Sequence, residues 1–187
     1  ISDTAASSEA QPGVGHFGGI HGDEAPSCVV LMAVADSLLR GYATVSRISD
    51  LVDAAEIWII PTINPDGYLL NSRVGFQGTD LNRVWPNGYT GATDTQPDEW
   101  EAAALWTFIH ANDIAVASST HNGTHGIFYP WSANVADPSD LASLGALCDA
   151  FAAASWESRE AKAKSSSMGI ATGTLGDWYL RNGGGLL

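Results

Sequence analysis

The stretch VGHFGGIHGDE, residues 14–24, is the part of this sequence that most clearly predicts the fold. Residues 14–20 predict a strand that runs into a glycine-rich turn. From Ala25 to about Arg40 the apolar residues recur at helical spacing, and Gly41 ends the pattern. The sequence therefore predicts a strand, a sharp turn and a helix in direct succession.

The alternation of strands and helices continues outward from this stretch. EIWIIPT (56–62) and IAVASST (114–120) are short, almost wholly apolar runs, which are typical of buried strands. Further helices are predicted at 97–111, from Pro138 to about Lys164, and at 174–182, with Gly183 ending the last. This order favours α/β layering in a single domain, and no second-domain boundary is visible.

Three remaining segments lack helical or strand periodicity. Residues 63–96 are rich in Gly, Asn, Asp and Pro and predict a long ordered loop, which in a compact domain is usually functional. Residues 165–173 predict a Ser/Gly/Thr linker, and the final GGGLL resembles the approach to another strand.

The composition excludes several classes of protein. With 21 acidic and 8 basic residues the formal net charge is −13, and such a surface repels phosphate backbones and argues against a nucleic-acid partner. No run of about 18 apolar residues occurs, so no membrane span is expected. Cys28 and Cys148 each lie in an apolar, helix-like stretch and are expected to be buried free thiols.

The turn after the first strand carries a candidate pair of metal ligands. His21 and Glu24 are separated by two residues, so an imidazole and a carboxylate can converge on one cation. Glycines at 18, 19 and 22 allow the backbone to bend sharply there. The alternative is a surface histidine and a first-turn glutamate favoured by the helix dipole.

A second candidate follows the strand at 114–120. His121 comes directly after that strand, and a third ligand far from a short pair is typical of catalytic zinc, where three protein ligands leave one position for water. His125 competes for this role, but His121 lies nearer the strand end. The alternative for His121 is a loop histidine bonded to backbone. We interpret His16 and His110 as packing or surface residues.

The long loop carries a set of residues suited to binding a carboxylate. Arg73, Asn82 and Arg83 lie in it, and an arginine fork matches a carboxylate with two parallel hydrogen bonds. Asp80 is a natural partner for the outer ring nitrogen of a metal-binding histidine. The alternative is a turn-rich surface loop with ordinary salt bridges.

Together these motifs resemble the zinc carboxypeptidase family, the carboxypeptidase A-type metallopeptidases. GGIHGDE is similar to the zinc motif, NPDGY (64–68) to a characteristic turn, and GTDLNRVW (78–85) to the motif that binds the substrate carboxylate. STHNGTHGIFYPW (119–131) is similar to the segment with the third ligand, and GTLGDWYL (173–180) to the stretch before the catalytic glutamate. The resemblance covers residues 14–187.

The resemblance implies a mixed, mostly parallel twisted sheet with helices on both faces. It also implies one Zn²⁺ ion on His21, Glu24 and His121, with Asp80 as the partner of His21. Asn82 and Arg83 would hold the free C-terminal carboxylate of a peptide substrate, and Arg73 would polarise the scissile carbonyl, on a looser match. The sequence leaves the localisation open, and the resemblance alone favours a secreted or periplasmic protein.

Two features depart from the family pattern. The family's general base is a glutamate on a strand after the Asp-Trp pair, here Asp177 and Trp178, and no glutamate follows Glu160. The segment before that pair also lacks the family's mobile tyrosine. We expect a fragment clipped at both ends, with the final strand and its base missing, that binds metal poorly or hydrolyses slowly. The alternatives are an amidase acting on cell-wall peptides or N-acyl amino acids, and an inactive peptide-binding module.

Overall fold

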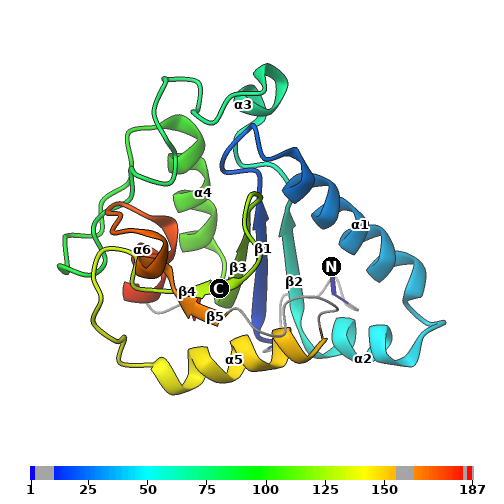
Figure 1. The fold of residues 1–187 in the computed structure, drawn as a ribbon. Coiled ribbons are helices and arrows are strands. Elements are labelled where there is room, and N and C mark those ends of the chain that lie inside the picture. The colour runs from blue at the N-terminus through cyan, green and yellow to red at the C-terminus, as the bar shows by residue number, and fades with distance from the viewer. Residues whose placement is uncertain (3–10, 155–161, 183–184, 187) are drawn as a thin grey trace.

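The computed structural model describes residues 1–2, 11–154, 162–182 and 185–186 (Figure 1). The elements in chain order are β1 (Gly13–Gly18), α1 (Ala25–Gly41), α2 (Ser46–Ala54), β2 (Glu56–Ile60), α3 (Pro65–Leu70), α4 (Trp100–Ala111), β3 (Ile114–Thr120), β4 (Ile127–Tyr129), α5 (Leu141–Ala154), β5 (Lys162–Lys164), the 3₁₀ turn η1 (Ser165–Met168), α6 (Leu175–Arg181) and β6 (Gly185–Leu186). Strands and helices are interleaved, so the predicted α/β class is confirmed.

Four strands form the main sheet in the order β2-β1-β3-β6. Every described pair in this sheet is parallel, and His16 on β1 stands level with Ile59 on β2 and Ser118 on β3. Strands β4 and β5 form a separate two-stranded parallel sheet. Because the central strands are parallel, their carboxyl ends share one edge of the sheet, and the residues that follow them meet there.

Helices cover both faces of the main sheet (Figure 1). α1 and α2 lie on one side, and α4 and α6 lie on the other. Phe17 of β1 is fully buried and meets Tyr179 of α6 edge to face, with ring centroids 6.5 Å apart. Leu105 of α4 and Trp178 of α6 belong to the same buried cluster. This packing fixes the sheet edge on which the candidate site is built, and it confirms the expected layers.

Two helices lie where the sequence had predicted none. The nine residues of α2 have Ile48, Leu51 and Val52 on one face, and Val52 is buried. α3 lies inside the predicted loop at 63–96 and begins where the Asn64 side chain accepts a hydrogen bond from the Gly67 N–H, with Pro65 next to the cap. The apolar spacing that predicts α2 and the Asn64–Pro65 start that predicts α3 are both present in the sequence.

The boundaries of the later elements also differ. α4 begins at Trp100 rather than Pro97, because its N-cap Glu99 has an extended backbone conformation. The predicted helix from Pro138 to about Lys164 is shorter: α5 covers 141–154, and 162–164 form a strand. The part at 155–161 lies outside the described residues, as does the predicted stop at Gly183. Within the GGGLL segment, Gly185–Leu186 form β6, which pairs with β3.

Both cysteines are buried, as predicted, and the described structure has no disulfide between them. Within the described residues no single helix is long and apolar enough to cross a membrane, although the bent pair formed by α1 and α2 meets the criterion of length and composition.

Candidate metal centre

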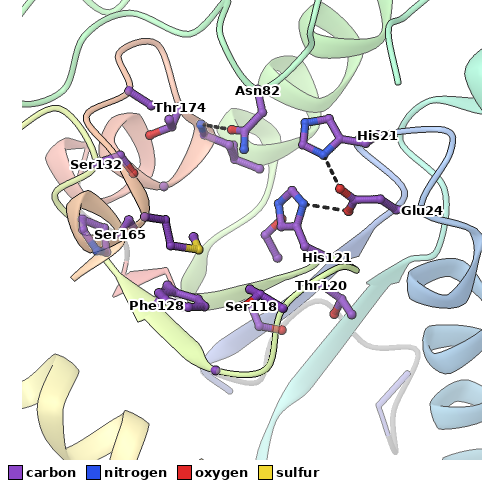
Figure 2. A pocket seen from close by; sticks show the side chains of 18 of the residues that line it. His21, Glu24, Asn82, Ser118, Thr120, His121, Phe128, Ser132, Ser165 and Thr174 are labelled. Atoms are coloured by element: carbon purple, nitrogen blue, oxygen red, sulfur yellow. Dashed lines mark hydrogen bonds and ion pairs between the residues drawn. The ribbon is translucent and has the colours of Figure 1, made fainter. Parts of the chain in front are cut away.

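Three side chains that the sequence singled out converge at the carboxyl edge of the sheet (Figure 2). His21 follows β1, Glu24 directly precedes α1, and His121 follows β3. Nδ1 of His21 lies 2.8 Å from Oε1 of Glu24, and Nδ1 of His121 lies 2.9 Å from Oε2 of the same carboxylate. One ligand atom from each residue lies within 4.8 Å of the other two, so this trio could share a metal ion.

The glycine-rich turn makes this convergence possible. Gly19 has a positive φ of 59°, which side-chain-bearing residues rarely adopt. Gly22 packs on the backbone of Gly67, whose carbonyl carbon lies 2.0 Å from the place a Cβ would occupy. The chain is tied across the turn by Ser27, whose hydroxyl accepts from the Gly19 N–H at 3.1 Å and donates to the Glu24 carbonyl at 2.7 Å. Larger residues at either glycine would displace the ligands.

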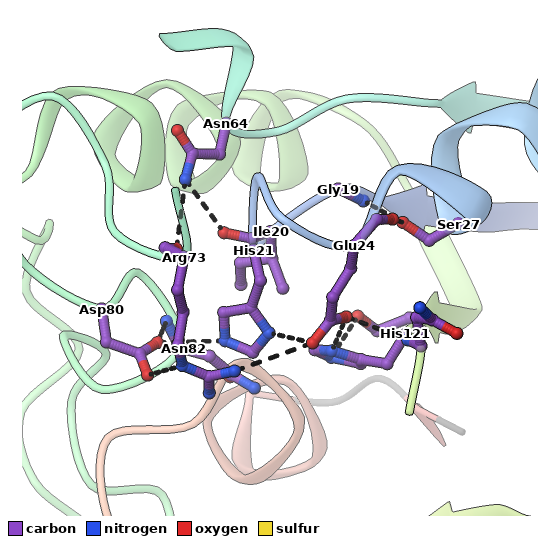
Figure 3. Close-up of polar contacts among 12 residues, drawn as sticks. Gly19, Ile20, His21, Glu24, Ser27, Asn64, Arg73, Asp80, Asn82 and His121 are labelled. Carbon is purple, nitrogen blue, oxygen red and sulfur yellow. Dashed lines mark hydrogen bonds and ion pairs between the residues drawn. The ribbon is translucent and has the colours of Figure 1, made fainter. Parts of the chain in front are cut away.

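The ring of His21 is held on both sides (Figure 3). Its Nε2 atom lies 3.1 Å from Oδ1 of Asp80, and its Nδ1 atom faces Glu24. Burial alone would lower the pKa of His21, but hydrogen bonds to Asp80 and Glu24 outweigh it and raise the pKa. When Asp80 accepts the proton on Nε2, Nδ1 is the ring nitrogen that would bind a metal ion in place of its present contact with Glu24.

Glu24 is the centre of the trio. Burial alone would raise its pKa, but hydrogen bonds from His121 and His21 outweigh burial and hold the pKa well below its usual value. The backbone N–H of Asn122 also donates to Oε2, at 3.0 Å. Glu24 is therefore ionised at neutral pH, as a metal ligand must be.

Asp80 joins the trio to the predicted carboxylate-binding loop. Its Oδ1 atom accepts from the Asn82 N–H at 2.9 Å as well as facing His21. Its Oδ2 atom accepts from Nε of Arg73 at 3.0 Å. Burial alone would raise the pKa of Asp80, and the hydrogen bonds from His21 and the Asn82 N–H lower it well below its usual value.

Arg73 lies beside the trio, between two carboxylates. Besides its bond to Asp80, a terminal nitrogen lies 3.7 Å from Oε1 of Glu24. The guanidinium therefore stands at the mouth of the site, and its role toward a substrate carbonyl stays a prediction.

A pocket of about 440 Å³ opens next to the trio, and Asn82 and Arg83 are among its lining residues. Oδ1 of Asn82 accepts from the backbone N–H of Leu175 at 2.9 Å. With this oxygen engaged, the NH₂ end of the amide is the one available to a ligand in the pocket. Arg83 is exposed and donates to the Asn82 carbonyl at 2.6 Å. Two donor groups thus lie on one wall, where a carboxylate could bind.

The other histidines are placed differently. His125 is exposed and is absent from the one potential metal group among the described residues. His16 is half-buried in the sheet, with Nδ1 2.8 Å from Oγ of Ser118. His110 is an exposed residue of α4, stacked on Trp106, with Nε2 2.8 Å from Oδ2 of Asp94. These positions fit the interpretation of His16 and His110 as packing and surface residues.

Sequence reasoning gave no site role to Thr174 and Leu175. Both line the pocket, and Leu175 orients the amide of Asn82 through its backbone. Thr174 caps α6 by accepting from the Asp177 N–H. The available signal was a threonine at the start of the predicted helix 174–182, which marks a turn but does not reveal which loop it contacts.

A family model described as zinc carboxypeptidase matches residues 1–186 of this sequence. The chain belongs to the zinc carboxypeptidase family. Carboxypeptidase D from Anas platyrhynchos is 28% identical over 141 residues, which cover 70% of this chain and 10% of that protein. Carboxypeptidase SOL1 from Arabidopsis thaliana is 27% identical over 135 residues, covering 70% of this chain and 27% of that protein. The chain spans about a tenth to a quarter of the length of these curated relatives.

Solved structures of zinc carboxypeptidases share the fold. The crystal structure of carboxypeptidase A from Helicoverpa armigera has a TM-score of 0.79 at 21% identity, over 98% of this chain and 52% of that chain. At this identity the likeness shows the fold alone. It agrees with the parallel sheet and with the layers of helices described above.

The trio fits the metal of a zinc carboxypeptidase. Two imidazole nitrogens and one carboxylate are ligands that zinc commonly takes, and three protein ligands leave a position for water. The hydrogen bond from His21 to Asp80 is the kind of outer contact that orients zinc-binding histidines.

Proposed function

We propose that this chain forms the metal-binding part of a metallocarboxypeptidase that hydrolyses the C-terminal peptide bond of peptides. The observation that supports it most is the placement of the trio His21, Glu24 and His121 on the same pocket as Asn82 and Arg83. A metal site beside two carboxylate-binding donors suits a substrate whose reactive carbonyl lies one residue from a free carboxylate.

In this proposal His21, Glu24 and His121 hold one zinc ion. When bound, zinc lowers the pKa of a coordinated water to about 7 and so supplies a nucleophile near neutral pH. Asp80 holds the His21 ring in the orientation that presents Nδ1. The preformed contacts leave little reorganisation for the ligands to undergo.

Asn82 and Arg83 set which bond is placed at the metal. The amide NH₂ of Asn82 and the guanidinium of Arg83 bind the terminal carboxylate, because both present N–H donors to the pocket. Arg73, at the mouth of the site, stabilises charge on the scissile carbonyl oxygen. The glutamate expected as general base is not among residues 1–187, so none of these residues is assigned its proton transfer.

Ligand binding tests this proposal without requiring turnover. We expect the zinc-loaded chain to bind N-acetylglycyl-phenylalanine at least tenfold more tightly than the corresponding C-terminal amide, as measured by isothermal titration calorimetry. Arg83→Ala should remove most of this difference. Arg40→Ala, in an ion pair on the exposed side of α1, is the matched control and should leave it unchanged. Equal affinity for the acid and the amide would refute the proposed binding of the terminal carboxylate by Asn82 and Arg83.

A further inference from the structure

A short turn before α6 packs against the residues proposed to bind the substrate carboxylate. We call residues 82–85 the donor loop and residues 173–175 the entry turn of α6. The Trp85 N–H donates to the Gly173 carbonyl at 3.1 Å. The indole rings of Trp85 and Trp178 also lie 4.8 Å apart, and both side chains are buried. Because these contacts are closely packed, a shift of the entry turn moves the donor loop with it.

The entry turn also orients the Asn82 side chain. The Leu175 N–H donates to Oδ1 of Asn82 at 2.9 Å, so the NH₂ end of the amide faces a ligand in the pocket (Figure 2). If the amide were reversed, its oxygen would face the substrate carboxylate and repel it. The hydrogen bond from Leu175 therefore keeps Asn82 in the orientation that suits a carboxylate.

Gly173 is in close contact with the backbone of the donor loop. A Cβ atom at this position would lie 2.3 Å from the carbonyl oxygen of Arg83 and 2.6 Å from its carbonyl carbon. Both distances are well inside van der Waals contact, so a side chain at position 173 would displace Arg83. Gly173 also has a positive φ of 70°, which residues with a side chain rarely adopt.

We propose that Gly173 is a positioning residue for carboxylate binding, because its missing side chain lets the entry turn hold Asn82 and Arg83 in place. Gly173 does not line the pocket, although Thr174 and Leu175 do. Its effect on a ligand therefore passes through the donor loop. This inference rests on the proposed function, since it takes the terminal carboxylate of a peptide as the ligand of Asn82 and Arg83.

The preference for a free carboxylate over its amide tests this role. Gly173→Ala should reduce the ratio of the affinities for N-acetylglycyl-phenylalanine and its C-terminal amide by about fivefold or more, since small displacements of binding groups are costly. Isothermal titration calorimetry measures both affinities. Zinc content and the affinity for the amide should be retained, because neither depends on the two donors. An unchanged ratio in the folded, zinc-loaded variant would overturn the proposal.

Gly91→Ala is the matched control for backbone strain. Gly91 has the same φ of 70°, but a Cβ atom there would meet only the flexible guanidinium of Arg181, at 2.9 Å. Its ratio of acid to amide affinity should equal that of the unsubstituted chain. An equal loss in Gly91→Ala and Gly173→Ala would overturn the proposal, because it would assign the loss to strain and not to displacement of Arg83.

Leu175→Pro tests the entry turn without changing a glycine. Leu175 is the first residue of α6, and Thr174 before it has an extended backbone with φ −82° and ψ 147°, so proline fits this position. Proline removes the N–H that Asn82 accepts, whereas Leu175→Val keeps it and has a side chain of similar size. The ratio should be about fivefold or more lower in Leu175→Pro than in Leu175→Val. Equal ratios would overturn the proposal, and this pair decides the question if Gly173→Ala does not fold.

The unsubstituted chain separates this inference from the function on which it rests. If it binds the acid no better than the amide, the proposed carboxylate binding fails, and the positioning role fails with it. If it prefers the acid and Gly173→Ala keeps that preference, only the positioning role is wrong.

Discussion

Nε2 of His21 lies 3.1 Å from Oδ1 of Asp80, so a carboxylate 59 residues away orients the first predicted metal ligand (Figure 3). The same carboxylate binds the Asn82 N–H and Arg73. One side chain therefore connects the trio to the loop that is proposed to bind the substrate.

Asp80→Asn should weaken zinc binding by about 10- to 100-fold while the chain stays folded, since contacts of this kind orient and polarise the ligand histidine. Competition with a chromogenic chelator measures the affinity. Asp36→Asn, whose carboxylate pairs with Arg40 on the exposed side of α1, is the matched control and should bind zinc normally. An unchanged affinity in Asp80→Asn would show that this contact does not tune the site.

Asn64→Ala should lower the free energy of unfolding by about 2–3 kcal/mol, because it leaves buried groups without partners. Asn64 is fully buried, and its Oδ1 atom accepts from the Gly67 N–H at 2.8 Å while Nδ2 donates to the carbonyls of Ile20 and Arg73. Urea denaturation measures the change. Asn134→Ala, which loses one exposed turn hydrogen bond, should cost less than about 1 kcal/mol. Comparable losses of stability in both variants would contradict the claim that the buried hydrogen bonds of Asn64 stabilise the fold.

The positions of the predicted ligands followed from strand ends. His21 and His121 each come after an apolar run, and parallel strands bring such residues to one edge of a sheet. The spacing of His21 and Glu24 placed both at a single turn. These inferences need only the apolar runs, the spacing of the ligands and the expectation that the strands are parallel, and all three can be read from the sequence.

Contacts between distant loops could not be predicted in the same way. The hydrogen bond from the Leu175 N–H to Asn82 joins residues 93 positions apart. Its donor is a backbone group, so the identity of the residue at position 175 does not predict it. The pairing of Arg73 with Asp80 depends on rotamers within one irregular loop. The helix α3, by contrast, was missed although Asn64 and Pro65 are ordinary start signals, because the loop's composition was given more weight.

Asp94 forms a second cluster, which predicts a pH dependence of stability. Its Oδ1 atom accepts from the indole N–H groups of Trp106 at 3.0 Å and Trp178 at 2.8 Å, and its Oδ2 atom lies 2.8 Å from Nε2 of His110. Burial alone would raise the pKa of Asp94, but the hydrogen bonds from Trp178, Trp106 and His110 outweigh burial and lower the pKa. A lowered folded-state pKa gives stability that is present above the unfolded value of about 3.9 and is lost as pH falls through the folded value.

Asp94→Asn should therefore lower the free energy of unfolding by about 1 kcal/mol at pH 7. The difference from the unsubstituted chain should begin to shrink below about pH 4, where Asp94 of the unfolded chain becomes protonated, and it should disappear as pH falls through the lowered folded-state pKa. Urea midpoints at pH 7, 5 and 3.5 measure the difference, and Asp98→Asn, an exposed neighbour on the same segment, is the control. A difference that stays constant or grows toward pH 3.5 would exclude the ionised Asp94 as its source.

The metal content of the purified chain tests the central claim most directly. The sequence alone predicted poor metal binding or slow hydrolysis, whereas the trio His21, Glu24 and His121 is already assembled in the described residues. After dialysis against zinc and removal of free ions, we predict about one equivalent of zinc, retained in His125→Ala and lost in His121→Ala. Less than about one-tenth of an equivalent in the unsubstituted chain, or full retention in His121→Ala, would contradict the three-ligand site.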